Sequence, residues 1–174
     1  MLARTTSAML GTAQDVSYLI DFLPSYLFPA EERTISQWLV VGKSLGGHSA
    51  WLTLRNGCPD YLTLISKRAK AHSLPFGPPY IPKSLADLIK QADPAAAPYT
   101  TADASNPFLG KKILVLSGKD DRIVPWSASK DFVENLNVGA HGVKKVVVHP
   151  GVGHECTDEM VQEMAAFIWN EALI

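Results

Sequence analysis

Cysteine is scarce in this 174-residue sequence, which has only Cys58 and Cys156. Two thiols cannot build a disulfide framework, and they are too few for a cysteine-rich metal cluster. We therefore expect both thiols to be reduced. Separately, we expect no metal site and no cofactor.

Long apolar runs and an excess of one charge are also missing. No stretch approaches the roughly 20 apolar residues that cross a bilayer, and residues 1–13 lack the continuous apolar core of a secretory signal. The sequence has 16 basic and 17 acidic residues, so it has no basic field that would attract nucleic acid. We expect a cytoplasmic protein with no membrane or nucleic-acid partner, and its 47% hydrophobic content is typical of one globular domain spanning residues 1–174.

The most informative segment is WLVVGKSLGG, residues 38–47, in which an apolar run leads into a serine bracketed by glycines. Gly42, Ser44 and Gly46 form the pattern G-x-S-x-G, the nucleophile elbow between a strand and a helix. The turn is strained, and small neighbours let the two elements approach closely. This pattern predicts an exposed serine with backbone N–H groups of a helix beside it.

Other interpretations of this segment exist. A glycine-rich turn with no chemical role would have the same five residues. The pair Lys43-Ser44 imitates the end of a phosphate-binding loop, but that loop needs a further glycine where this sequence has Gln37. Nucleotide binding is therefore disfavoured, and the surrounding sequence has to decide between a plain turn and an elbow.

A serine hydroxyl needs a base, and the base needs an acid that orients it. Residues 111–118 have the pattern of a buried strand, and residues 144–149 form a short β-branched run. Asp121 follows the first run and His154 follows the second. Parallel strands gather their carboxyl ends at one edge of a sheet, where sites assemble. The order serine, aspartate, histidine therefore places all three candidates at one edge.

With these residues the chain resembles the α/β-hydrolase superfamily. The resemblance covers three ordered motifs: the elbow at 42–46, G-x-x-D-x-x-V-P at 118–125 and G-x-G-H at 151–154. It implies that Ser44 is the nucleophile, Asp121 the orienting acid and His154 the general base. It also implies that the Leu45 N–H belongs to the oxyanion hole.

Several residues compete for these roles. Asp120 shares the acid's loop, but its offset from Gly118 fits the motif less well than that of Asp121. His48 lies one helical turn after Ser44, beneath the elbow, where we expect it to pack or to form a hydrogen bond on the helix face. The remaining histidines lack a motif, and we assign no role to them: His72, His141 and His149.

The predicted architecture is a partial α/β-hydrolase fold, a mostly parallel sheet with flanking helices. Strands are expected at 37–42, 111–117 and 144–149. Helices are expected at 14–23 over the sheet, ending or bending at Pro24, from near Ser127, and after a Thr157 cap, where the buried stripe would be Val161, Met164, Ala165 and Ile168. The proline-rich segment 66–110, with one helix capped by Ser84, would be a lid or a plain connection.

Two parts of a complete α/β-hydrolase have no counterpart in this sequence. Residues 1–36 are too few for the first four strands, which also provide the loop with the second oxyanion donor, and 55–59 lead into a turn where a sixth strand would follow. We therefore expect an exposed sheet edge that self-associates or binds a partner. Two functions stay open: a serine hydrolase acting on a small ester or thioester, and a catalytically impaired remnant that binds a partner.

Overall fold

The computed structural model describes residues 2–55, 70, 73 and 83–173. Over these residues it is a mixed α/β protein. The helices are α1 (Leu2–Leu27), α2 (Leu45–Arg55), α4 (Lys83–Ala92), α5 (Lys130–Asn135) and α6 (Asp158–Ile168), with short 3-10 turns η1 (Pro94–Ala96) and η2 (Trp126–Ala128) and a π-helical end η3 (Trp169–Leu173).

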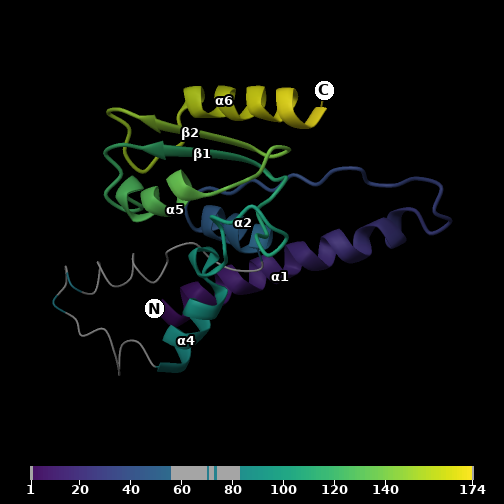
Figure 1. Ribbon diagram of the computed structural model, residues 1–174, viewed down its shortest axis with the longest axis horizontal. Coiled ribbons are helices and arrows are strands. Elements are labelled where there is room, and N and C mark those ends of the chain that lie inside the picture. Colours follow the sequence, from purple (N-terminus) through teal and green to yellow (C-terminus); the bar gives the residue numbers. More distant parts are fainter. Residues whose placement is uncertain (1, 56–69, 71–72, 74–82, 174) are drawn as a thin grey trace.

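The sheet of the described residues has two parallel strands, β1 (Lys112–Gly118) and β2 (Val143–His149). Their register runs from Lys112 opposite Val143 to Gly118 opposite His149. Both coincide, to within one residue at each end, with strands that the sequence predicts. Figure 1 shows α6 on one side of the sheet and α5 and α2 on the other. The prediction of a parallel sheet with flanking helices is confirmed.

The main hydrophobic core lies on the α5 side of the sheet. Its buried members lie in β1, in α5, and in the segments before β1 and after α5: Ala97, Phe108, Ile113, Phe132, Val133 and Leu136. Trp51 of α2 packs edge-on against Phe132, with ring centroids 5.3 Å apart, and against Phe108 at 6.2 Å. Because aromatic rings bury a large area, these contacts join α2 to the sheet-containing part of the protein.

The predicted strand at 37–42 is wrong. The structure has no regular strand over these residues, although β1 and β2 form as expected. A strand needs a hydrogen-bonded neighbour, and none of the described residues pairs with this segment. Its apolar side chains stay partly exposed instead, with 40% of Trp38 and 63% of Val41 accessible to solvent.

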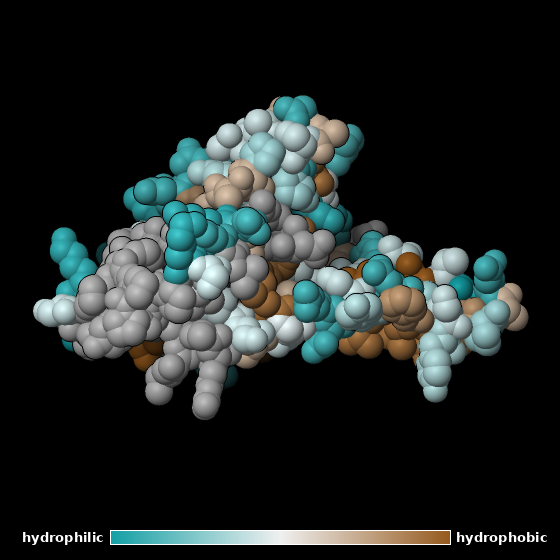
Figure 2. Space-filling view, turned by 90° about the horizontal axis from the view of Figure 1, so that it is seen from below, coloured by the Kyte–Doolittle hydropathy of each residue, from teal (hydrophilic) through white to brown (hydrophobic). Residues whose placement is uncertain are grey.

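The helix α1 also departs from expectation. It starts at Leu2 and continues through Pro24 to Leu27, so it is longer than predicted at both ends. It packs on α2 and projects away from the sheet, which it was expected to cover (Figure 1). Figure 2 shows hydrophobic side chains on this projecting part of the molecule. Tyr18, Phe22 and Tyr26 are among its exposed residues.

The sequence predicts caps at the N-terminal ends of two helices, α4 and α6. The Thr157 side chain accepts a hydrogen bond from the Met160 N–H at 3.3 Å, which confirms the cap of α6. The predicted buried stripe of α6 is wrong in part, because Val161 and Ala165 are exposed and Met160 is buried. Helix α4 begins at Lys83, so Ser84 lies inside its first turn and does not cap it.

The suspected lid can be described only from residue 83 onward and at residues 70 and 73, and the rest of 66–82 lies outside the described residues. So do Cys58, His72 and the turn at 56–59. In the described part of the chain, no helix is both long and apolar enough to cross a membrane.

Candidate active site

The turn before α2 has a strained backbone at the predicted serine, although no strand precedes it. Ser44 has a φ of 53°, in the left-handed region that non-glycine residues rarely occupy. A Cβ on Gly42 would lie 2.0 Å from the backbone oxygen of Gly46, so only glycine fits there. A Cβ on Gly46 would meet nothing within 4 Å. The close approach therefore depends on the first glycine of the motif and not on the second.

The position of Ser44 is set by packing and not by a strand. Ser44 directly precedes α2, and α2 is anchored by Leu52, which is 1% exposed, and by Trp51 in the aromatic core. The core also contains Phe132 of α5, which follows the acid loop. The helix and its core contacts thus place the serine where a strand of a complete sheet would otherwise hold it.

Asp121 lies in the loop after β1, and its carboxylate is held on both sides. Oδ1 accepts hydrogen bonds from the backbone N–H groups of Ile123 at 2.7 Å and Val124 at 2.8 Å, and Oδ2 lies 2.8 Å from His154 Nδ1. Burial by itself would raise the pKa of Asp121, but the hydrogen bonds from His154 and the two N–H groups outweigh it and lower the pKa below its ordinary value. The carboxylate is therefore ionised at neutral pH and fixed in orientation.

His154 is positioned by contacts between its loop and the acid loop. The Lys119 N–H donates to the His149 carbonyl at 2.9 Å, and the Asp120 N–H donates to the Val152 carbonyl at 3.0 Å. A Cβ on Gly118 would lie 2.3 Å from that same Val152 oxygen, so the end of β1 has to be glycine for the loop to rest on it. We missed this role of Gly118 in the sequence, where the only signal was the first glycine of the G-x-x-D motif.

The structure brings Ser44, Asp121 and His154 together. His154 Nε2 lies 2.8 Å from Ser44 Oγ, and its other ring nitrogen faces Asp121. Exposure increases along this series: the side chain of Asp121 is 9% exposed and that of His154 is 25% exposed, while Ser44 is an exposed residue. This is the arrangement in which an ionised acid orients an imidazole toward an accessible hydroxyl.

The competing residues lie differently. Asp120 is exposed, and its backbone N–H supports the histidine loop, whereas it is Asp121 that contacts His154. The His48 N–H donates to the Ser44 carbonyl at 3.3 Å in the first turn of α2. Neither Asp120 nor His48 takes part in the side-chain contacts that join Asp121, His154 and Ser44.

Leu45 is the first residue of α2. The first four N–H groups of a helix have no carbonyl partner within it, and the helix dipole adds partial positive charge there. The Leu45 N–H, adjacent to Ser44, is therefore chemically suited to stabilise an oxyanion formed at the serine. It is the residue that the sequence motif predicts for this task.

Among the residues that the structure describes, no group of three or more histidine, cysteine, aspartate or glutamate side chains could hold a metal ion. Cys156 is exposed, with a free thiol close in sequence to His154. Comparison with known protein families, with curated proteins and with solved structures finds no match to this chain.

Proposed function

We propose that this chain is a serine hydrolase that cleaves a small ester or thioester through an acyl-enzyme on Ser44. The observation that supports it is the unbroken series from Asp121 through His154 to Ser44, with 2.8 Å at both contacts. Ser44 and His154 are 110 residues apart in sequence, and their contact neither caps a helix nor forms part of the sheet. The contact has the geometry in which a base activates a nucleophile.

In the first half of the reaction, Ser44 Oγ attacks the carbonyl carbon of the substrate while its proton passes to His154 Nε2. The resulting imidazolium is stabilised by the ionised carboxylate of Asp121. When the tetrahedral intermediate collapses, the bond to the alcohol or thiol breaks, and the leaving group takes the proton from His154. The acyl group remains on Ser44.

In the second half, water replaces the leaving group. His154 removes a proton from the water, whose oxygen attacks the acyl carbon, and the Ser44 oxygen leaves with the proton from His154. The free acid is released and the site returns to its starting state. The partial exposure of His154 and the accessibility of Ser44 are consistent with entry of water and of a small substrate.

The Leu45 N–H supplies one donor for the oxyanion in both halves. A hydrolase with one donor fewer is typically slower by ~10²–10³ in turnover. We therefore expect slow turnover on simple esters, with formation of the acyl-enzyme easier to detect than sustained hydrolysis.

A fluorophosphonate probe tests this proposal, because it forms a covalent bond only with an activated serine. We expect mass spectrometry of the labelled chain to place the probe on Ser44 and Ser44→Ala to abolish labelling. Ser117→Ala is a matched control on β1 and should label like the parent. Labelling of Ser49 or Ser117, or none on a folded chain, would overturn the assignment.

The second candidate is a binding module that has lost its catalytic function. The specific observation in its favour is the apolar segment 38–41, where Leu39 is 52% and Val41 63% exposed and no described strand pairs with it. Exposed apolar surface of this kind is typical of an interaction site. The probe separates the two functions, since a remnant would fold without reacting at Ser44.

A further inference from the structure

Lys144, the second residue of β2, holds the C-terminal end of α5. Its Nζ donates hydrogen bonds to the carbonyl oxygens of Val133 at 2.8 Å, Glu134 at 2.9 Å and Leu136 at 2.8 Å. An ammonium group has three N–H donors, so this contact uses all of them. The three bonds join the end of α5 to the strand that leads to the loop of His154.

The C-terminal end of α5 is chemically suited to bind a cation. The last carbonyl groups of an α-helix have no N–H partner further along it, and the helix dipole adds partial negative charge there. Burial lowers the pKa of Lys144, because desolvation disfavours the charged form, while the nearby Glu134 carboxylate opposes this shift. The three carbonyl oxygens replace the water that the ammonium group loses, and the hydrogen bonds are strengthened by its charge.

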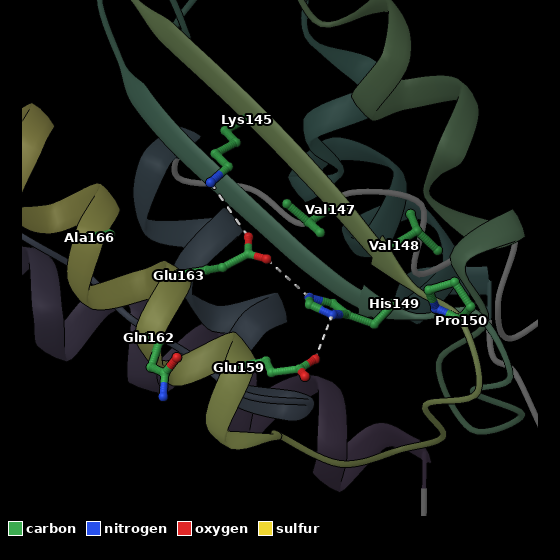
Figure 3. A pocket seen from close by; sticks show the side chains of 9 residues that line it. All are labelled: Lys145, Val147, Val148, His149, Pro150, Glu159, Gln162, Glu163 and Ala166. Atoms are coloured by element: carbon green, nitrogen blue, oxygen red, sulfur yellow. Dashed lines mark ion pairs between the residues drawn. The ribbon is translucent and has the colours of Figure 1, made fainter.

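Lys144 and the next residue of β2 reach opposite faces of the sheet, as successive side chains of a strand do. Lys144 contacts α5, and in the register with β1 it lies opposite Ile113, which belongs to the core on that side. Lys145 reaches toward α6 instead, where its Nζ lies 3.5 Å from Glu163 Oε2 (Figure 3). The two neighbouring lysines thus have different partners, and Lys145 is a matched control for Lys144.

Helix α5 in turn positions the helix that follows Ser44. Phe132 and Val133 of α5 are buried in the core, and the Phe132 ring lies 5.3 Å from the ring of Trp51 in α2. Ser44 directly precedes α2, and no strand of the described chain pairs with the segment before it. The position of α2 therefore depends on the core, and the core depends on where α5 lies.

Hydrophobic burial is non-directional, so it does not by itself fix where a helix of six residues lies along the sheet. Hydrogen bonds have preferred distances and angles, and three of them at one end do fix it. We propose that Lys144 is a positioning residue for Ser44 and His154: it holds α5, and through Trp51 it holds α2, in place relative to the strand that leads to His154. This role rests on the proposed function of Ser44 and His154.

Loss of the ammonium group should lower the rate of reaction at Ser44 more than the affinity for a probe. Ser44 Oγ and His154 Nε2 lie 2.8 Å apart, and a misplacement of about 1 Å can cost ~10² in rate. A small shift of α2 changes this distance, because Ser44 moves with the helix. We therefore expect kinact, the maximal rate of labelling, to fall, and KI, the probe concentration at half that rate, to change little.

The first experiment tests the link between β2 and α5 and needs no activity. Thermal midpoints of the full chain are compared for the parent, Lys144→Met and Lys145→Met. Methionine keeps most of the apolar stem but cannot donate, so Lys144→Met leaves three carbonyl groups without their donor, and we expect its midpoint to be about 4–8 °C lower. Lys145→Met removes a partly exposed ion pair and should stay within about 2 °C of the parent. Equal midpoints of the two variants would overturn the link.

The second experiment separates positioning from stability. Fluorophosphonate labelling of Ser44 is measured as a function of probe concentration, at a temperature well below the midpoint of every variant, so that each chain is folded. We expect kinact of Lys144→Met to be about 10–100-fold lower than that of the parent, with KI within about twofold. Lys145→Met should label like the parent. A lower midpoint of Lys144→Met with an unchanged kinact would overturn the positioning role and leave only a structural one.

Lys144→Gln provides a second variant in case Lys144→Met does not fold. Its amide keeps two N–H donors on a shorter side chain, so we expect a smaller loss of stability and a kinact that is still below that of the parent. A kinact equal to the parent's would overturn the positioning role. No labelling of the parent would instead overturn the proposed function, and the positioning role with it, whereas the difference in midpoints would still show the link to α5.

Discussion

His154 Nε2 lies 2.8 Å from Ser44 Oγ, although 110 residues separate them in sequence. In a complete parallel sheet, neighbouring strands would bring such residues to a common edge. Here β1 and β2 supply only the loops of Asp121 and His154, and α2 supplies Ser44 through the aromatic core. The contact therefore depends on helix packing as much as on the sheet.

The two glycines of the elbow should respond differently to the same substitution. Gly42→Ala places a Cβ 2.0 Å from the Gly46 oxygen, so the turn has to open, at a cost of about 1–3 kcal/mol or more. We expect loss of Ser44 labelling and a lower thermal midpoint. Gly46→Ala meets nothing within 4 Å and lies in α2, where alanine is favoured, so it should keep the stability of the parent. Equal effects would contradict the close approach at Gly42.

The acid of the site is assigned by a pair of neighbouring substitutions. Asp121→Asn removes the charge that orients and stabilises the His154 imidazolium, and a loss of this kind lowers turnover by ~10⁴. Asp120→Asn changes an exposed residue and should have little effect. Hydrolysis of a nitrophenyl ester, or the labelling rate where turnover is too slow, measures both. The reverse ranking would move the acid to Asp120.

The lowered pKa of Asp121 gives the protein a specific sensitivity to acid. Because hydrogen bonds hold the folded-state pKa below its ordinary value, the carboxylate adds stability above the pKa of the unfolded chain. This stability is lost as the pH falls through the folded-state pKa. The difference in unfolding free energy between the parent and Asp121→Asn should shrink as the pH falls below the ordinary pKa of an aspartate. Denaturant titrations at several pH values measure it, and a constant difference would contradict the hydrogen-bonded carboxylate.

The exposed apolar segment before the elbow should cause self-association. Trp38 and Val41 lie outside the regular sheet and are partly accessible, so a second copy can cover them. We expect sedimentation equilibrium to show oligomers of the parent, and Trp38→Ser with Val41→Lys to shift the chain toward monomer. Trp169→Ser is the control, since Trp169 is 60% exposed at the C-terminal end of the described chain. A monomeric parent would show that this surface does not associate.

The sequence by itself determined those features that depend on local patterning. The run that became β1 is apolar and the run that became β2 is rich in valine, and the Thr157 cap of α6 is a local hydrogen bond, so all three could be predicted. The candidate site residues were expected because three motifs, in this order along the chain, resemble those of a hydrolase superfamily. The left-handed backbone of Ser44 was expected from the same motif, whose first glycine, Gly42, allows two chain segments to approach closely.

Only the tertiary structure decided the features that depend on a partner far along the chain. Residues 37–42 have the composition of a strand, but a strand exists only where a neighbour accepts its hydrogen bonds, and the described chain offers none. The direction of α1 and the exposed side of α6 likewise follow from what lies beside them. The burial of His149 between Glu159 and Glu163 arises from the docking of α6 on β2, which no local sequence pattern encodes.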